Sequence, residues 1–235
     1  ISRREQLKSI IRYSPVSVDG AWKLRSTRPG GLQSFAYRFD FSNSLSATGI
    51  WVASRLAATN APLTILLNDK GYKASGQDVV EGVNRGEPVL AFEPLFFGST
   101  SPDETEPAYW EMLVASRGDR ALGLEVAQLI ATAKSFKTPT GPKNIRLMTD
   151  GIRSQVVALA AAALEPDLFS GIESKHAMSS LSYLLDAPVP YRTAPDLFCL
   201  DLYKYFDIDQ MTMLAFPAKV TMGSKVVFLP GSVGN

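Results

Sequence analysis

Residues 143–166 read KNIRLMTDGIRSQVVALAAAALEP, and this stretch decides the fold of the chain. Within it, residues 145–149 have the pattern of a buried strand. Asp150 and Gly151 form a sharp turn, and residues 154–164 make an alanine-rich helix whose small side chains allow close packing on a sheet. The stretch therefore predicts a strand, a tight turn and a buried helix in succession.

The segments before and after this stretch also alternate between strand and helix patterns. Residues 34–40 and 48–53 are rich in aromatic and β-branched side chains and flank a turn at Asn43-Ser44, which predicts an antiparallel hairpin. Apolar runs at 63–67 and 89–92 are typical of parallel strands buried on both faces. The order predicts an α/β fold: a mainly parallel central sheet, helices on both faces and an antiparallel N-terminal hairpin. The other expected elements are strands at 22–25, 168–172, 218–221 and 225–229, and helices within 1–15 and at 75–84, 108–115, 121–133, 179–186 and 196–214.

Length and composition limit the possible functions. The chain has 235 residues, of which 46% are hydrophobic, enough to bury a full core. We expect one domain over residues 1–235, with residues 1–30 as an N-terminal extension. Because Ile1 is not an initiator methionine, we expect the chain to be processed or to be one part of a longer protein. A net charge of +1 argues against a nucleic-acid partner. The sequence contains no apolar run of about 18 residues, so it predicts no membrane-spanning helix.

Four stretches carry a resemblance to a known family: PLTILLNDKG at 62–71, VNRGEPVLAFEPLFFG at 83–98, IRLMTDGIRSQVVALAAAALEPDLFSGI at 145–172 and FDIDQMTMLAFPAKV at 206–220. Together they resemble the α/β-hydrolase superfamily, and within it the acetyl xylan esterases and related carbohydrate esterases. The resemblance implies ester hydrolysis by a Ser-Asp/Glu-His triad, with the serine held at a Gly-x-Ser-x-Gly turn between strand and helix. It implies no cofactor, and it alone favours an extracytoplasmic or secreted location.

The family's serine is missing from the turn where the resemblance places it. Aligning from the alanine-rich helix puts the nucleophile position at Ile152, whereas counting from strand residue Ile145 puts it at Gly151. Neither side chain carries an oxygen or sulfur that could attack a carbonyl. Ser154 is the remaining candidate, either as a displaced nucleophile or as a helix-start serine that contacts free backbone amides.

The catalytic base is equally in doubt. His176 is the only histidine, and it precedes the position that the family order gives to the base. We expect a surface or hydrogen-bonded histidine without an identifiable partner. A histidine-rich metal site is excluded, and no metal is predicted, although a carboxylate-only magnesium or calcium site stays open.

Four residues are candidates for a ligand pocket. Asp69 follows the first apolar strand, where hydrolases place the loop that lends an oxyanion-hole amide. Glu93 closes the next strand at the carboxyl edge of the sheet, as a ligand contact or a loop-start carboxylate. In the Ile152 register, Arg153 matches the arginine that follows the serine of glucuronoyl esterases. Trp110 lies beside a polar loop and is a candidate sugar contact.

These observations favour an α/β-hydrolase-like domain that has lost the complete triad and acts as a structural or carbohydrate-contacting domain. Its expected partners are a carbohydrate or small ester, or another domain of the same polypeptide. The alternative is an active carboxylic ester hydrolase that uses Ser154, or one whose histidine is supplied from outside this chain.

Overall fold

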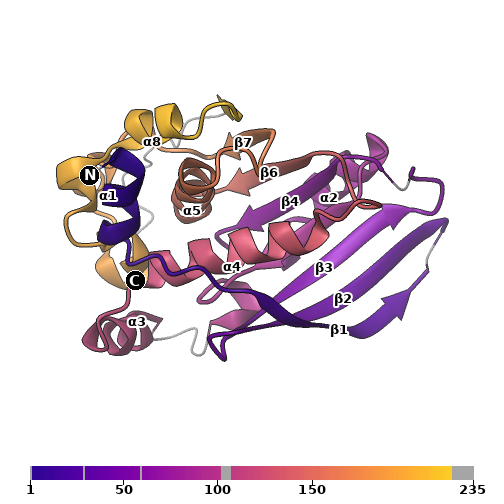
Figure 1. Ribbon diagram of the computed structural model, residues 1–235, viewed down its shortest axis with the longest axis horizontal. Coiled ribbons are helices and arrows are strands. Elements are labelled where there is room, and N and C mark those ends of the chain that lie inside the picture. The colour runs from indigo at the N-terminus through magenta and orange to yellow at the C-terminus, as the bar shows by residue number, and fades with distance from the viewer. Residues whose placement is uncertain (1, 29, 59, 102–106, 224–235) are drawn as a thin grey trace.

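The computed structural model describes residues 2–28, 30–58, 60–101 and 107–223, and the strand expected at 225–229 lies outside these ranges. The described strands form one eight-stranded sheet in the order β1-β2-β3-β5-β4-β6-β7-β8 (Figure 1). The fold class predicted from the sequence is confirmed, because a mainly parallel sheet carries an antiparallel N-terminal region.

The N-terminal region is the antiparallel part of the sheet. It consists of β1 (Val18–Thr27), β2 (Leu32–Phe41) and β3 (Ser46–Ser54), and β3 pairs antiparallel with β5 (Val89–Glu93). The hairpin expected between the second and third strands is present, with Ser44 in the left-handed region at φ 64°.

The parallel part contains β4 (Leu63–Asn68), β5, β6 (Ile145–Asp150), β7 (Gly171–Lys175) and β8 (Lys219–Met222). All residues of β4 and β5 are buried. Ile65 and Leu67 pack into the larger hydrophobic cluster, whereas the intervening Leu66 packs into a second cluster. Because side chains alternate between the faces of a strand, the two clusters lie on opposite faces of the sheet.

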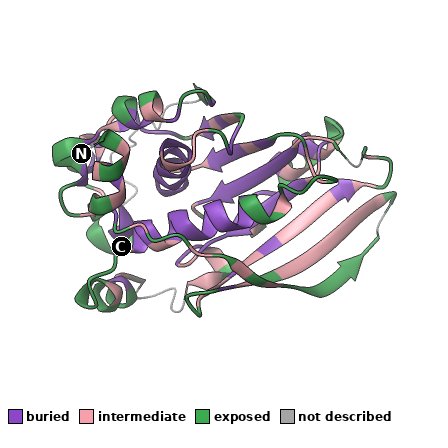
Figure 2. Cartoon of the chain, viewed as in Figure 1, coloured by how far each residue is buried: buried purple, intermediate pink, exposed green. Residues whose placement is uncertain are grey.

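Helices cover both faces. The larger cluster includes residues of α1 (Arg3–Ile10), α4 (Ala121–Phe136), α5 (Ile152–Leu164) and α8 (Ile208–Leu214), and the smaller one includes residues of α2 (Gly76–Asn84). The alanines of α5 are completely buried, as the purple helix in Figure 2 shows. Their small side chains let α5 contact the sheet, α4, α1 and α8 at once. The remaining helical segments are η1 (Tyr72–Ala74), η2 (Gly98–Thr100), α3 (Pro107–Ser116), α6 (Tyr183–Asp186), η3 (Tyr191–Thr193), η4 (Pro195–Phe198) and α7 (Leu202–Tyr205).

Two predicted elements differ from the structure. The strand expected at 168–172 is found three residues later as β7, because Leu168 closes a turn on Glu165 and pairing with β6 starts only at Ser170. The helix expected at 196–214 is divided into η4, α7 and α8. Asp201, the residue before α7, takes a left-handed conformation at φ 67° and so separates α7 from η4, and the side chain of Asp207 caps the N-terminus of α8.

The helix expected at 179–186 is also shorter and is reduced to α6. The hydroxyl of Ser180 and the amide of Leu181 both donate to the Asp207 carboxylate, so this segment is used to hold α8 in place. Within the described ranges, no helix combines the length and apolarity needed to cross a membrane.

Candidate functional site

A cleft of about 410 Å³ opens at the carboxyl edge of the parallel strands. Its walls come from the ends of neighbouring strands, because β4, β6 and β7 run parallel and side by side. In open α/β sheets this edge is where ligands bind. The polar residues that line the cleft are Asn68, Asp69, Lys70, Asp150, His176 and Tyr183.

The turn between β6 and α5 forms the floor of the cleft. Gly151 lies at its apex with φ 117° and ψ 170°, a conformation that favours glycine, and Ile152 is the first helical residue. A Cβ atom on Gly151 would lie 2.2 Å from Cγ of Asp69. Backbone conformation and close contact therefore both restrict this position to glycine, and a nucleophilic side chain does not fit there.

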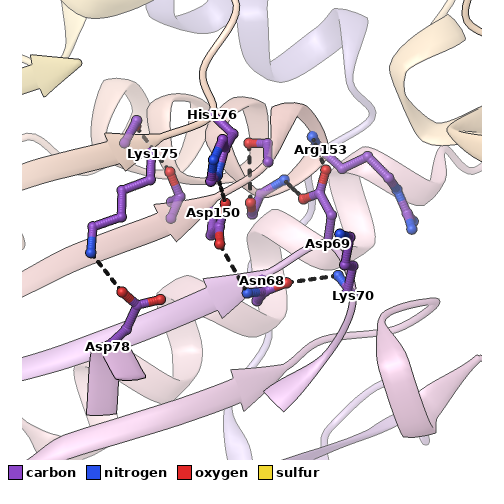
Figure 3. A network of polar contacts seen from close by, with 12 residues as sticks. Asn68, Asp69, Lys70, Asp78, Asp150, Arg153, Lys175 and His176 are labelled. Atoms are coloured by element: carbon purple, nitrogen blue, oxygen red, sulfur yellow. Dashed lines mark hydrogen bonds and ion pairs between the residues drawn. The ribbon is translucent and has the colours of Figure 1, made fainter. Parts of the chain in front are cut away.

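Asp69 caps the N-terminus of α5 from the loop after β4 (Figure 3). Its Oδ1 accepts a hydrogen bond from the Ser154 amide at 2.7 Å, and its Oδ2 accepts one from the Arg153 amide at 3.0 Å. These amides have no partner within the helix, and the helix dipole favours an anion there. Burial nevertheless raises the pKa of the Asp69 carboxyl, although the charge of Arg153 and the amide hydrogen bonds act in the opposite direction.

The loop after β4 uses its own backbone amides within the protein. The Asp69 amide donates to the Asp150 carbonyl at 3.0 Å, and the Lys70 amide donates to Oδ1 of Asn68 at 2.8 Å. The amide of Gly71 donates to the Asn68 carbonyl at 2.8 Å. In hydrolases with an intact elbow, this loop and the first turn of the helix supply the amides that stabilise an oxyanion. Here the loop instead places a carboxylate on the amides of the helix.

Ser154 lies inside this cap. It is the third residue of α5, its side chain is completely buried, and its hydroxyl is 3.2 Å from the Gly151 carbonyl oxygen. The single cysteine, Cys199, is also unsuited to attack, because burial raises the pKa of its thiol to about 11. A thiol with that pKa is almost entirely protonated at neutral pH.

His176 and Asp150 form a pair at the mouth of the cleft. His176 follows β7 directly, and its Nδ1 lies 2.5 Å from Oδ1 of Asp150, which ends β6. Asn68 donates from Nδ2 to the other Asp150 oxygen at 3.3 Å (Figure 3). The imidazole is 63% exposed, so His176 is the surface, hydrogen-bonded residue that we expected. The expectation that it lacks a partner is wrong, because the parallel register brings the ends of β6 and β7 together.

Lys175 does not supply an alternative base. Its ammonium contacts Asp78 at 2.6 Å and Glu81 at 3.2 Å. The hydrogen bond to Asp78 is the main reason that its pKa is raised, whereas a catalytic lysine base needs a lowered pKa.

Arg153 is directed away from the cleft into a buried acidic cluster. Its Nε donates to Oδ1 of Asp196 at 2.8 Å, and its Nη2 lies 3.9 Å from Glu125 and 4.0 Å from Glu111. All of these side chains are buried. Burial, followed by repulsion from Asp196, raises the pKa of Glu111 to about 8, and the pKa of Glu125 is raised for the same two reasons. One guanidinium therefore holds three carboxyl groups together.

Glu93 and Trp110 occupy other parts of the molecule. Glu93 is buried at the end of β5, where its carboxylate accepts from the amides of Tyr72 at 2.8 Å and Ser99 at 2.9 Å and from the Ser99 hydroxyl. It therefore ties η1 to η2. Trp110 lies on α3, 41% exposed, with its ring edge-to-face against Tyr109. Of the four predicted pocket residues, Asp69 lines the cleft. Among the described residues, no group of histidine, cysteine and carboxylate side chains is arranged to hold a metal ion.

The fold is similar to that of carbohydrate esterases of known structure. A candidate acetyl xylan esterase from Bacteroides fragilis matches with a TM-score of 0.78 at 11% identity, over 94% of this chain and 66% of that chain. The acetyl xylan esterase from Paenibacillus sp. R4 matches with a TM-score of 0.65 at 13% identity, over 97% and 89%. A glucuronoyl esterase from Solibacter usitatus matches with a TM-score of 0.64 at 12% identity, over 94% and 73%.

These structures establish the fold. The chain has an α/β-hydrolase fold that resembles the carbohydrate esterases, as the four sequence stretches predicted. It spans slightly less than two thirds of the Bacteroides fragilis protein. No protein-family model matches the sequence, and no curated protein sequence matches it significantly.

Proposed function

We propose that this chain is an α/β-hydrolase-fold domain without serine-esterase activity, and that its cleft contacts a carbohydrate or a small ester. The observation that carries the proposal is the Asp69 carboxylate on the amides of Arg153 and Ser154. An acyl-transfer enzyme needs such amides for the negative charge that develops on the substrate oxygen. A fixed carboxylate occupies the amides and would also repel that charge.

The nucleophile position supports the same proposal. Gly151 has no side chain at the apex of the turn, and the space for one is filled by Asp69. Ser154 is completely buried with its hydroxyl turned to the Gly151 carbonyl. A serine nucleophile must reach a substrate carbonyl, so burial argues against Ser154 in this role.

The cleft nevertheless has the chemistry of a carbohydrate site. Asp69 and Asp150 offer carboxylate oxygens, His176 has a second ring nitrogen, Lys70 has an ammonium group, and Tyr183 has an aromatic ring. Sugar hydroxyl groups both donate and accept hydrogen bonds, so they match this mixture of acceptors and donors. We therefore propose that the cleft binds a sugar or an acylated sugar. The same sugar could also be bound by an active partner domain.

The competing function is an active carboxylic ester hydrolase. One observation favours it: His176 is oriented by Asp150, as a general base is oriented by a carboxylate. That function needs either Ser154 as nucleophile, after an opening of the cap, or a histidine from outside the chain. A histidine oriented in this way also serves binding, because it accepts a hydrogen bond from a ligand hydroxyl.

Calorimetry and ester turnover measured on one preparation test the proposal. We expect xylan-type oligosaccharides to give saturable heat without hydrolysis, and Lys70→Ala and His176→Ala to weaken binding about tenfold each. Lys204→Ala is the matched control, since Lys204 is exposed and lies outside the cleft. An absence of saturable heat across a glycan panel would remove the carbohydrate contact, and ester turnover would remove the loss of catalysis.

A further inference from the structure

A second pocket, of about 250 Å³, lies at the opposite edge of the parallel strands. It is bounded by Leu63 at the start of β4, Pro88 just before β5, Phe136 at the end of α4 and Pro142 shortly before β6. These positions are the amino ends of the strands, whereas the candidate cleft lies at their carboxyl ends. The two pockets are therefore separated by the length of the parallel strands.

Aromatic side chains form most of the wall of this second pocket. Phe35 and Trp51 are cross-strand partners on β2 and β3, and their rings are stacked with centroids 5.4 Å apart. Tyr37 lies edge-to-face with Phe35 at 6.1 Å, and Phe136 completes the wall. All of these side chains are half-buried, and Figure 2 shows the strands β2 and β3 mainly in the intermediate colour. Aromatic surface held rigidly in a sheet at this exposure is suited to stacking on a planar ring.

A positive charge lies directly on this aromatic wall. The ammonium of Lys23, on β1, lies 3.7 Å above the centroid of the Phe35 ring. The residues that line the pocket carry neither an acidic nor a basic side chain. Lys23 already uses the ring face that would attract a ligand cation, and it repels a second positive charge. Because Lys23 is exposed and its ammonium lies on the ring of a wall residue, we expect it to attract a negative group of a bound ligand.

We propose that this pocket binds an aromatic carboxylic acid, with the ring against Trp51 and Phe136 and the carboxylate near Lys23. The site is independent of the carboxyl-edge cleft and goes beyond the function proposed for it. The ring supplies apolar burial, which stabilises binding in proportion to the area removed from water. Lys23 supplies the preference for an anion over a neutral or cationic analogue.

A matched series of probes tests both parts of the proposal: 3-phenylpropanoate, 3-phenylpropan-1-ol and 3-phenylpropan-1-amine. Binding is followed by calorimetry and by the indole N–H resonance of Trp51, identified with Trp51→Phe. We expect the acid to bind about fivefold more tightly than the alcohol, and the amine to bind least. Lys23→Gln should make the acid and the alcohol equal, whereas Arg25→Gln, a charge change on the same strand, should not.

A pocket-filling variant separates specific binding from surface adsorption. Ala61 lines the pocket, so Ala61→Phe should abolish binding of all three probes. Ala58→Phe, an exposed position in the same loop, should leave binding unchanged. The proposal is overturned if no probe shifts the Trp51 resonance, if Ala61→Phe binds as wild type does, or if the preference for the acid survives in Lys23→Gln.

Discussion

Replacing Asp69 by alanine removes the cap of α5 and tests whether this carboxylate occupies an anion site. Two hydrogen bonds, at 2.7 Å to Ser154 and 3.0 Å to Arg153, are lost. Loss of a capping carboxylate destabilises a protein by about 0.5–2 kcal/mol. Part of that loss is offset, because burial raises the pKa of Asp69 and so disfavours its charged form in the folded protein. We expect a net loss of about 1 kcal/mol, or about 2–4 °C in Tm for a chain of this size.

The freed amides should then bind an anion from solution. A ligand with a Kd of about 10 mM stabilises the folded state by about 1.4 kcal/mol at about 100 mM. Acetate at that concentration should therefore restore the Tm of Asp69→Ala, relative to chloride at equal ionic strength, and leave wild type unchanged. Asp69→Asn is the control, since it removes the charge but still fills the site. Equal acetate responses in wild type and Asp69→Ala, or none in either, would refute this interpretation of the cap.

The remaining predictions concern the turn and the buried cluster. Gly151→Ser should destabilise the protein by at least about 1–3 kcal/mol through its backbone conformation alone. The destabilisation should be smaller in an Asp69→Ala background, because the contact between the new Cβ atom and the Asp69 carboxylate is removed. A double-mutant cycle measured by urea unfolding gives this difference. Arg153→Met should destabilise the protein by about 3–5 kcal/mol, since it removes the cation that pairs with the buried Asp196 carboxylate. Arg38→Met, which breaks an exposed pair with Asp40, should change the free energy of unfolding by less than about 1 kcal/mol. Glu111 keeps its proton in the folded state up to about pH 8 and loses it near its ordinary value of 4.5 when unfolded, so its contribution lowers stability as pH rises between these values, by up to about 1.4 kcal/mol per pH unit. Urea unfolding at several pH values in that window should show a flatter profile for Glu111→Gln, and an unchanged slope would contradict the raised pKa.

Much of the fold follows from local pattern. The uninterrupted apolar runs at 63–67 and 89–92 are typical of strands covered on both faces, and the alanines at 158 and 160–163 predict a helix packed closely on the sheet. The pattern of apolar residues fails to predict where an element begins or ends when a hydrogen bond decides that boundary. Leu168 and Phe169 are apolar and buried like strand residues, but Leu168 closes a turn and Phe169 connects that turn to β7. The left-handed Asp201 similarly divides a segment whose composition is helical throughout.

The site was predictable in position but not in chemistry. The sequence locates the turn at Gly151 and Ile152 and the loop at Asp69, yet it suggests only a backbone amide from that loop. The role of the Asp69 carboxylate depends on two segments that lie 84 residues apart and meet in space. The pairing of Asp150 with His176 was not predicted from the sequence, because the strand was placed at 168–172. With that strand ending at residue 175, the parallel register places His176 beside Asp150, and the pair could have been found.

The most direct test of the central claim is the rate of ester hydrolysis by the purified protein. Release of p-nitrophenol from p-nitrophenyl acetate and of acetate from acetylated xylan would be measured for wild type and for Ser154→Ala, with thermal unfolding to confirm that both are folded. We expect both proteins to give the rate of the buffer blank, because Asp69 occupies the elbow amides and the described residues that line the cleft include no serine, threonine or cysteine. Turnover by wild type that disappears in folded Ser154→Ala would contradict the loss of catalysis.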